Sequence, residues 1–279
     1  MKIARFSVDG WDSYGRVEDD RVRVIQGDIF GEHKETQASY PLNRVKLLPP
    51  TRPTTFWAVG LNYAAHIAHQ EVALDAERIK RESQGFRPWH KGAHCIIGQG
   101  DAVVIPVDSD YVHYEGELVI VIGKPARKIT PQEAPHFIFG YTVGNDISSE
   151  GSWHNDISNW RKKGSDTFGP VGPWIETDVD PHKLEIITRL NGRERDRGTT
   201  SGMVHNCYAI VSGISKYATL HPGDIILTGA PGAVEQIKPG DVMEVEIPGI
   251  GVLRNPVVGE ALKGTHTISR IGSPVSQGV

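Results

Sequence analysis

The pattern of apolar and polar positions predicts a chain built mainly of short strands. A run of β-branched and aliphatic residues over 118–122 ends at Gly123, which is typical of a buried strand. Strict alternation over 242–247 predicts a half-buried strand. The 31 glycines and 18 prolines favour many strands and tight turns over long helices. The chain is therefore expected to adopt an α+β fold that is mainly β.

The first fifty residues predict a small β domain of their own. Residues 3–8 alternate, Asp9-Gly10 is a turn signal, and residues 21–25 alternate again. A proline-rich link follows around residues 47–53. We therefore predict a small N-terminal β domain over 1–50 and a larger domain over 51–279. No residue pattern in the small domain indicates chemistry, so we expect it to serve packing or a dimer contact.

Helical signals are few. Residues 64–84 contain neither glycine nor proline, carry many charges, and follow Asn62, a plausible N-cap. They predict a partly exposed helix that can act as a lid. A capping box over 130–133 predicts a short helix, and another helix is expected around 204–217.

Three acidic residues form the main candidate for chemistry. Residues i and i+2 of a strand face the same side, so Glu115 and Glu117 present two carboxylates with only Gly116 between them. Asp146 ends a second predicted strand and supplies a third carboxylate. Such a cluster needs a proton or a cation, and oxygen ligands suit Mg²⁺, Mn²⁺ or Ca²⁺. The same spacing is also typical of a solvated strand face; the apolar run after Glu117 favours the metal site.

Basic side chains near these acids are candidates for proton transfer. His66 and His69 lie three residues apart and would share one face of the predicted helix. Histidine titrates near neutral pH, so either is a candidate general base. His69 is equally consistent with a surface histidine, whereas the place of His66 beside the turn at residues 60–63 favours a functional role. Lys163 precedes a Gly-Ser turn and predicts a cation directed at the carboxylates, the alternative being a surface lysine.

Composition and charge limit the binding partners and the cell compartment that we expect. A net charge of -4 without a basic stripe predicts no binding to nucleic acid or to an acidic membrane surface. No apolar run approaches the ~20 residues that span a bilayer. The N-terminus leads directly into a strand pattern, so we expect no signal peptide. Two cysteines far apart in sequence fit free thiols in a reducing cytoplasm.

Six stretches, in this order along the chain, together resemble the fumarylacetoacetate hydrolase family. They are residues 59–63 with His66, 114–118, 140–148, 163–170, 220–229 and 249–255. The resemblance covers nearly the whole chain, and residues 1–50 resemble the small N-terminal domain of many bacterial members. It implies a mixed β-sandwich roll that usually forms homodimers.

The resemblance also implies a set of site residues. Glu115, Glu117 and Asp146 would hold Mg²⁺ or Mn²⁺, Lys163 would neutralise developing charge, and His66 would activate water or shuttle a proton. The positions it places at the substrate are Tyr63, Lys91, Thr228 and Gly229.

Family members cleave or rearrange 2-oxo acids. Our first hypothesis is a metal-dependent hydrolase that cleaves a C–C bond in an acylpyruvate-type, fumarylpyruvate-like 2-oxo acid during breakdown of aromatic compounds. The alternative within enzymes is a lyase or isomerase on the same head group, of the oxaloacetate decarboxylase or 2-hydroxyhepta-2,4-diene-1,7-dioate isomerase type. A non-catalytic relative that binds a small 2-oxo acid is the third hypothesis.

Several positions depart from the family pattern. Many members have a glutamate where this chain has His69, and an arginine where it has Glu150; we keep both among the candidate catalytic residues. A family glutamine is replaced by Trp153 or His154, and a family threonine by Ala230. The metal ligands and the lysine are kept, while positions that grip substrate and activate water are changed. The resemblance therefore favours 2-oxo acid enolate chemistry and leaves hydrolase, decarboxylase, tautomerase and dehydratase open.

Overall fold

A computed structural model describes residues 1–71, 86–150, 158–232 and 235–261, with side chains described up to Ile67 in the first of these ranges. Most of the predicted lid helix, Trp153, His154 and the C-terminal tail lie outside the described residues. No helix among those described is long and apolar enough to cross a membrane.

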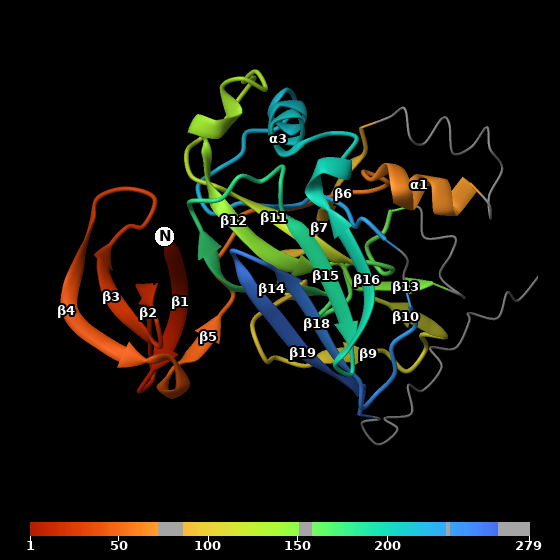
Figure 1. Cartoon of the computed structure of the whole chain (residues 1–279), viewed down its shortest axis with the longest axis horizontal. Helices are drawn as coiled ribbons and strands as arrows, with labels where there is room; N and C mark the ends of the chain where they lie inside the picture. Colours follow the sequence, from red (N-terminus) through yellow and green to blue (C-terminus); the bar gives the residue numbers. More distant parts are fainter. Residues whose placement is uncertain (72–85, 151–157, 233–234, 262–279) are drawn as a thin grey trace, which may run out of the picture.

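The N-terminal region is an antiparallel meander (Figure 1, red to orange). Its strands are β1 (Lys2–Val8), β2 (Trp11–Glu18), β3 (Arg21–Gly27), β4 (His33–Pro41) and β5 (Lys46–Leu48). The inward residues Ala4, Phe6, Val8 and Val22 form a small core. Strand β1 also pairs with a strand of the larger region, with Lys2 opposite Glu176, so the meander continues the main sheet.

The main sheet has the order β4-β3-β2-β1-β14-β12-β11-β17-β6-β7 through the described residues. Its further strands are β6 (Phe56–Val59), β7 (Pro88–Lys91), β11 (Gly116–Ile122), β12 (Ile138–Asn145), β14 (Gly169–Glu176) and β17 (Ile225–Leu227), and β8 (Ile96–Ile97) pairs with β14. Every residue of β11 is buried. This burial on both faces explains why residues 118–122 form a continuous apolar run rather than an alternating one.

A second sheet packs beside the first in the order β16-β15-β18-β19-β9. Its strands are β9 (Val103–Ile105), β15 (Glu185–Leu190), β16 (Arg193–Thr199), β18 (Val242–Ile247) and β19 (Gly251–Gly259). Strand β18 alternates in burial, as its sequence predicts. A separate two-stranded sheet joins β10 (Tyr111–His113) to β13 (Ser148–Glu150).

In the part of the chain that the structure describes, two α-helices lie over the sheets (Figure 1). Helix α1 spans Ala64–Glu71, and α3 spans Cys207–Ser215. The side chain of Asn206 caps α3 by accepting a hydrogen bond from the Ala209 amide. The apolar face of α3, which includes Ile210 and Ile214, packs in the same core cluster as Ile120 of β11.

The Asp224 side chain holds residues 54–55, just before β6, against the turn before β17. Its buried carboxylate accepts hydrogen bonds from the backbone amides of Thr54 at 3.1 Å, Thr55 at 2.7 Å and His221 at 2.7 Å. These bonds hold the chain before β6 against the turn before β17, where the two strands pair in parallel.

The mainly β fold with a small N-terminal β region is confirmed. The capping box forms, since Thr130 N donates to Glu133 Oε2 at 2.8 Å, but the helix that follows is a 3-10 turn over Ala134–His136. Pro135 lies in the first positions of that turn, where proline is tolerated, and the chain leaves the turn at Phe137 to enter β12. The segment after Asp146 begins with strand β13, which pairs with β10.

Candidate metal centre

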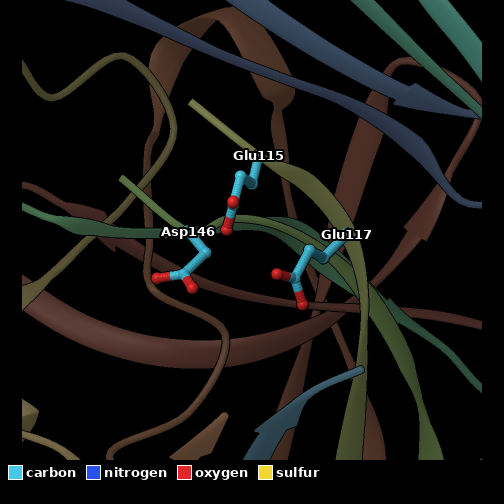
Figure 2. A group of neighbouring side chains, drawn as sticks. All are labelled: Glu115, Glu117 and Asp146. Carbon is cyan, nitrogen blue, oxygen red and sulfur yellow. The ribbon is translucent and has the colours of Figure 1, made fainter. Parts of the chain in front are cut away.

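Three carboxylates converge where β11 begins and β12 ends. Glu115 immediately precedes β11, Glu117 lies within it, and Asp146 follows the last residue of β12. The antiparallel register sets Gly116 opposite Asn145, and Asp146 N donates to Glu115 O at 2.8 Å. One oxygen from each carboxylate lies within 4.8 Å of the others, and the side chains point toward one another (Figure 2).

Gly116 allows this arrangement by its lack of a side chain. A Cβ at this position would lie 2.5 Å from Thr188 Cγ2 and 2.9 Å from Val245 Cγ1. Strands β15 and β18 therefore approach the backbone between the two glutamates more closely than any other residue would permit. The positions of Glu115 and Glu117 therefore depend on how closely the two sheets pack at Gly116.

Lys163 bridges two of the carboxylates. Its ammonium nitrogen donates to Glu115 Oε2 at 2.8 Å and to Asp146 Oδ2 at 2.6 Å. It also lies 5.5 Å from the centroid of the Trp89 ring, within the range of a cation–π contact. The Lys163 side chain is 11% exposed, so these charge-assisted bonds are only partly screened by water.

Lys91 contacts the third carboxylate from the other side. Its buried ammonium donates to Asp146 Oδ1 and, at 3.1 Å, to the carbonyl of Phe168. Lys91 lies on strand β7, 55 residues before Asp146 in the sequence. The sequence placed Lys91 at the substrate; its contacts in the structure are with a candidate metal ligand.

Burial and neighbouring charges shift the pKa values of Glu115 and Glu117 in opposite directions. Burial would raise the pKa of Glu115, but Lys163 beside it, together with His113 and His66, holds that pKa below its usual value. Burial, and then the negative charges of Asp146 and Glu115, raise the pKa of Glu117 well above its usual value. Burial would lower the pKa of Lys163, but Asp146 and Glu115 raise it above its usual value. Glu117 is thus the carboxyl that most needs a proton or a cation.

Residues after β17 line the other side of the cluster. Gly229 N donates to Glu117 Oε2 at 2.6 Å, and Thr228 Oγ1 donates to the carbonyl of Leu118 at 2.9 Å. Gly229 has φ of +93°, and a Cβ there would lie 2.9 Å from the side chain of Asn62. A glycine is therefore required for this amide to face the carboxylate.

The N-terminal turn of α1 brings two further predicted residues to this region. His66 is largely buried, and its Nδ1 lies 3.1 Å from the carbonyl oxygen of Ala230. Tyr63 is 1% exposed, and burial, with negative charges that include Glu117, raises the pKa of its hydroxyl well above its usual value. The side chain of His69 lies outside the described residues.

Glu150 lies in a separate charged cluster. Its Oε1 is 3.5 Å from His113 Nε2 and 2.5 Å from Lys162 Nζ. Burial would raise the pKa of Glu150, but the bonds to His113 and Lys162 lower it to about 2. Glu150 therefore ties the strand before Glu115 to the residue before Lys163.

Sequence reasoning did not find the roles of Trp89 and His113. Trp89 lies two residues before Lys91 in β7, so the alternation of a strand places the two on the same side. That signal was present in the sequence, but it does not indicate which side faces the acids. His113 ends β10 two residues before Glu115, which lies outside any strand, so no such alternation links that pair.

The donor set fits a divalent, oxygen-preferring cation. Three carboxylates supply hard oxygen ligands from two adjacent strands, and no cysteine or histidine belongs to the group among the described residues. Burial, and then the charges of Asp146 and Glu115, raise the pKa of Glu117, and a divalent cation at the cluster would favour its ionised form.

Two family models match the chain. The model described as fumarylacetoacetate (FAA) hydrolase C-terminal matches residues 55–258. A second model, described as Rv2993c-like, N-terminal, matches residues 1–50.

Similar proteins include one of nearly the same length. Protein Rv2993c of Mycobacterium tuberculosis is 40% identical over 259 residues, which cover 92% of this chain and 94% of that protein. The 4-hydroxyphenylacetate degradation bifunctional isomerase/decarboxylase of Salmonella dublin is 34% identical over 247 residues, covering 86% of this chain and 56% of that protein.

Solved structures share the fold. The crystal structure of 5-carboxymethyl-2-hydroxymuconate delta-isomerase from Mycobacterium smegmatis matches with a TM-score of 0.84 and 39% identity, covering 93% of this chain and 100% of that chain. Maleylpyruvate hydrolase from Sphingobium sp. SYK-6, in complex with manganese(II) ion and pyruvate, matches with a TM-score of 0.76 and 26% identity, covering 94% and 100%.

Proposed function

The chain belongs to the fumarylacetoacetate hydrolase family, and we propose that it is a metal-dependent enzyme that converts a 2-oxo acid through its enolate. The observation that carries this proposal is the convergence of three carboxylates with the ammonium of Lys163, which bridges Glu115 and Asp146. A bound Mg²⁺ or Mn²⁺ would polarise the 2-oxo group and stabilise the enolate.

Each charged residue has a distinct role in this proposal. Glu115, Glu117 and Asp146 would hold the cation, whose charge would draw the carboxylate and 2-oxo oxygens of the substrate to this cluster. Lys163 places a positive charge beside the same carboxylates, where it neutralises charge that develops on the substrate. Lys91 keeps the Asp146 carboxylate oriented through its contact with Oδ1.

His66 is the proposed proton carrier. The 3.1 Å contact between its Nδ1 and the Ala230 carbonyl oxygen fits a protonated Nδ1, which leaves Nε2 as the basic nitrogen. The first turn of α1 carries this imidazole near Glu115, and once the ring is protonated its charge lowers the pKa of that carboxyl. His66 would take the proton that enolate formation releases, or would activate a water molecule.

Two outcomes follow from the same enolate. Hydrolysis of an acylpyruvate-type substrate is supported by the likeness to maleylpyruvate hydrolase, whose structure holds manganese and pyruvate. Isomerisation or decarboxylation is supported by the higher identity to the Mycobacterium smegmatis isomerase and by the Salmonella bifunctional enzyme. The fold and the carboxylate cluster are compatible with both outcomes. A role in aromatic catabolism is part of the proposal.

Product identification tests the function. Protein loaded with Mg²⁺ or Mn²⁺ is assayed with an acylpyruvate, with oxaloacetate and with an unsaturated 2-oxo diacid. A carboxylic acid plus pyruvate indicates hydrolysis, CO₂ plus pyruvate indicates decarboxylation, and a shifted double bond or a keto–enol change indicates isomerisation. Binding without turnover identifies a non-catalytic relative and contradicts the proposal.

Metal removal is the matching control. Chelation should abolish turnover while the protein remains folded by circular dichroism, and Mg²⁺ or Mn²⁺ should restore it. Full activity after exhaustive chelation would contradict the metal-dependent mechanism. We also propose a homodimer, which light scattering would reveal as twice the mass of one chain.

A further inference from the structure

The side-chain amide of Asn62 joins two distant segments of the chain. Its Nδ2 donates to the carbonyl oxygen of His205 at 2.9 Å and to that of Thr228 at 2.7 Å, and its Oδ1 accepts from the backbone amide of His205 at 2.8 Å. A primary amide has two N–H donors, so both are used. These partners also fix which end of the amide carries the nitrogen, since a flipped amide would turn its oxygen toward two carbonyls.

The bonds of Asn62 are shielded from water. Asn62 is 1% exposed, and it does not line the cleft of about 390 Å³ that Tyr63, β16 and the loop after β17 enclose. Inside a protein a hydrogen bond is electrostatically stronger than in water, and a buried carbonyl that loses its donor is costly. The amide therefore holds its partners firmly.

One peptide group connects Asn62 to Glu117. The carbonyl of Thr228, which accepts from Asn62, and the N–H of Gly229, which donates to Glu117 Oε2 at 2.6 Å, belong to the same planar amide. A donor at the oxygen of a peptide polarises that peptide and strengthens its N–H as a donor. Asn62 thus acts on the Glu117 carboxylate through the 228–229 peptide.

The loop after β17 approaches Asn62 closely because residue 229 is a glycine. A Cβ at Gly229 would lie 2.9 Å from the Cβ of Asn62 and 3.2 Å from the carbonyl oxygen of Val59. Strands β6 and β17 pair in parallel just before these segments, with Ala58 opposite Leu227. The main sheet therefore delivers Asn62 and the 228–229 peptide to the same place.

Asn62 also holds the start of the helix that carries His66. Its backbone carbonyl accepts from the amide of Val204 at 2.8 Å, which adds to the two side-chain bonds with the next residue. The carbonyl oxygen of Ala230, in the loop after β17, lies 3.1 Å from His66 Nδ1. The loop that Asn62 fixes therefore contacts both His66 and Glu117.

We propose that Asn62 is a positioning residue for the metal centre, which orients the Glu117 carboxylate for the cation through the 228–229 peptide and keeps His66 in place relative to it. The proposal rests on the proposed function, because it assumes that Glu117 ligates a cation. Residues that orient metal ligands typically contribute about 10- to 100-fold in metal affinity.

Two variants remove the donors of Asn62. Asn62→Ala shortens the side chain, and Asn62→Leu keeps its branched shape without any N–H. Asn255→Ala and Asn255→Leu are the matched controls. Asn255 is also 1% exposed, and its Nδ2 also donates to two carbonyl oxygens, those of Gly98 at 2.9 Å and Asp101 at 2.8 Å. Neither carbonyl belongs to the carboxylate cluster, so the controls lose the same kind of bonds elsewhere in the fold.

NMR of the metal-free protein measures the link itself. In wild type the amide proton of Gly229 should resonate downfield and exchange slowly with solvent, because it donates to a buried carboxylate. Both Asn62 variants should move this signal upfield and speed its exchange about tenfold or more. Both Asn255 variants should leave it at its wild-type position.

Calorimetric titration with Mn²⁺ measures the consequence for the metal centre. The Asn62 variants should bind Mn²⁺ about tenfold or more weakly than wild type, and the Asn255 variants should stay within about threefold of it. All titrations are made well below the melting temperature of each variant, so that loss of folded protein does not enter the affinity.

The results separate this proposal from the proposed function. An unchanged Gly229 signal in the Asn62 variants, or equal loss of Mn²⁺ affinity in the Asn62 and Asn255 variants, overturns the positioning role even if the enzyme is active. Selective loss of Mn²⁺ affinity in the Asn62 variants, with no turnover of any substrate by wild type, supports the positioning role and overturns the catalytic proposal. Absence of Mn²⁺ binding by wild type overturns both.

Wild type alone decides if neither Asn62 variant folds. Both side-chain amide protons of Asn62 should then exchange as slowly as the amide proton of Gly229, because each has a buried carbonyl partner. Fast exchange of either the Asn62 side-chain protons or the Gly229 amide proton would overturn the link between them.

Discussion

The ammonium nitrogen of Lys163 lies 2.6 Å from Oδ2 of Asp146, and the ammonium of Lys91 contacts the other oxygen of the same carboxylate. Each oxygen of Asp146 thus has its own lysine. A carboxylate oxygen has two lone pairs, so Asp146 can accept these bonds and still ligate a cation. The two lysines differ in exposure and in their other partners, which separates their expected roles.

Replacement of Lys163 should impair the chemistry more than the fold. Lys163→Met removes the charge beside the reacting head group, and kcat should fall about 10²-fold or more. Metal binding should persist without loss of affinity, because a positive charge next to the ligands is removed. Steady-state kinetics and calorimetric metal titration measure the two effects.

The control for this variant is Lys183→Met. Lys183 is 82% exposed and pairs with Asp180, so its loss should leave kcat unchanged. If Lys163→Met turns over within about threefold of wild type, Lys163 does not stabilise developing charge.

Replacement of Lys91 should instead destabilise the protein. The Lys91 side chain is 0% exposed, and its removal leaves the buried Asp146 carboxylate without one of its two cations. Loss of one partner of a buried ion pair costs about 3–5 kcal/mol. Urea unfolding of metal-free Lys91→Met should show a free energy of unfolding lower by about 3 kcal/mol or more, and a loss below 1 kcal/mol would contradict the buried contact.

Gly116→Ala tests the link between packing and the acid pair. The new methyl group would press on Thr188 and Val245, and overpacking of this kind costs about 1–3 kcal/mol. Displacement of Glu115 and Glu117 should also weaken Mn²⁺ binding, measured by calorimetry. Gly202→Ala, where a Cβ makes ordinary contact, is the control; unchanged Mn²⁺ affinity in Gly116→Ala would show that the acids do not depend on this packing.

The ion pairs of Glu150 should contribute stability in a defined pH range. The pKa of Glu150 is lowered in the folded protein, from 4.5 to about 2, so the folded state favours the charged form. This contribution is complete above the unfolded pKa near 4.5 and is lost as pH falls toward 2. Wild type should therefore be more stable than Glu150→Gln at pH 7, by a margin that shrinks below pH 4.5.

Urea unfolding of both proteins at pH 7, 5 and 3 measures this margin. A margin that stays constant or widens toward pH 3 would rule out a stabilising ionised Glu150.

Local patterns were sufficient for the strands that carry the acids. The apolar run after Glu117 predicts a buried strand, and β11 is buried throughout. The alternation of residues 242–247 predicts β18, and the N-terminal alternation predicts the meander. These features follow from the two-residue repeat of a strand, which a sequence displays directly.

Long-range partners were not accessible from such patterns. Lys91 was predicted from resemblance to lie at the substrate, which stays a prediction. Its contact with Asp146 arises because β7 pairs with β6 and β6 with β17 at the far side of β11. Similarly, Glu150 was a candidate catalytic residue, and its contacts are with His113 and Lys162. His69 and the rest of the predicted lid stay as predictions.

The sequence by itself determined which residues could form strands, that Glu115 and Glu117 would share a face, and that Asp146 would end a strand. Only the tertiary structure decided that two lysines from different parts of the chain share one carboxylate, and that Tyr63, β16 and the loop after β17 enclose a cleft. The physical reason is that periodicity is a local property of the backbone, whereas charge pairing and cavity shape depend on which strands become neighbours in the sheet.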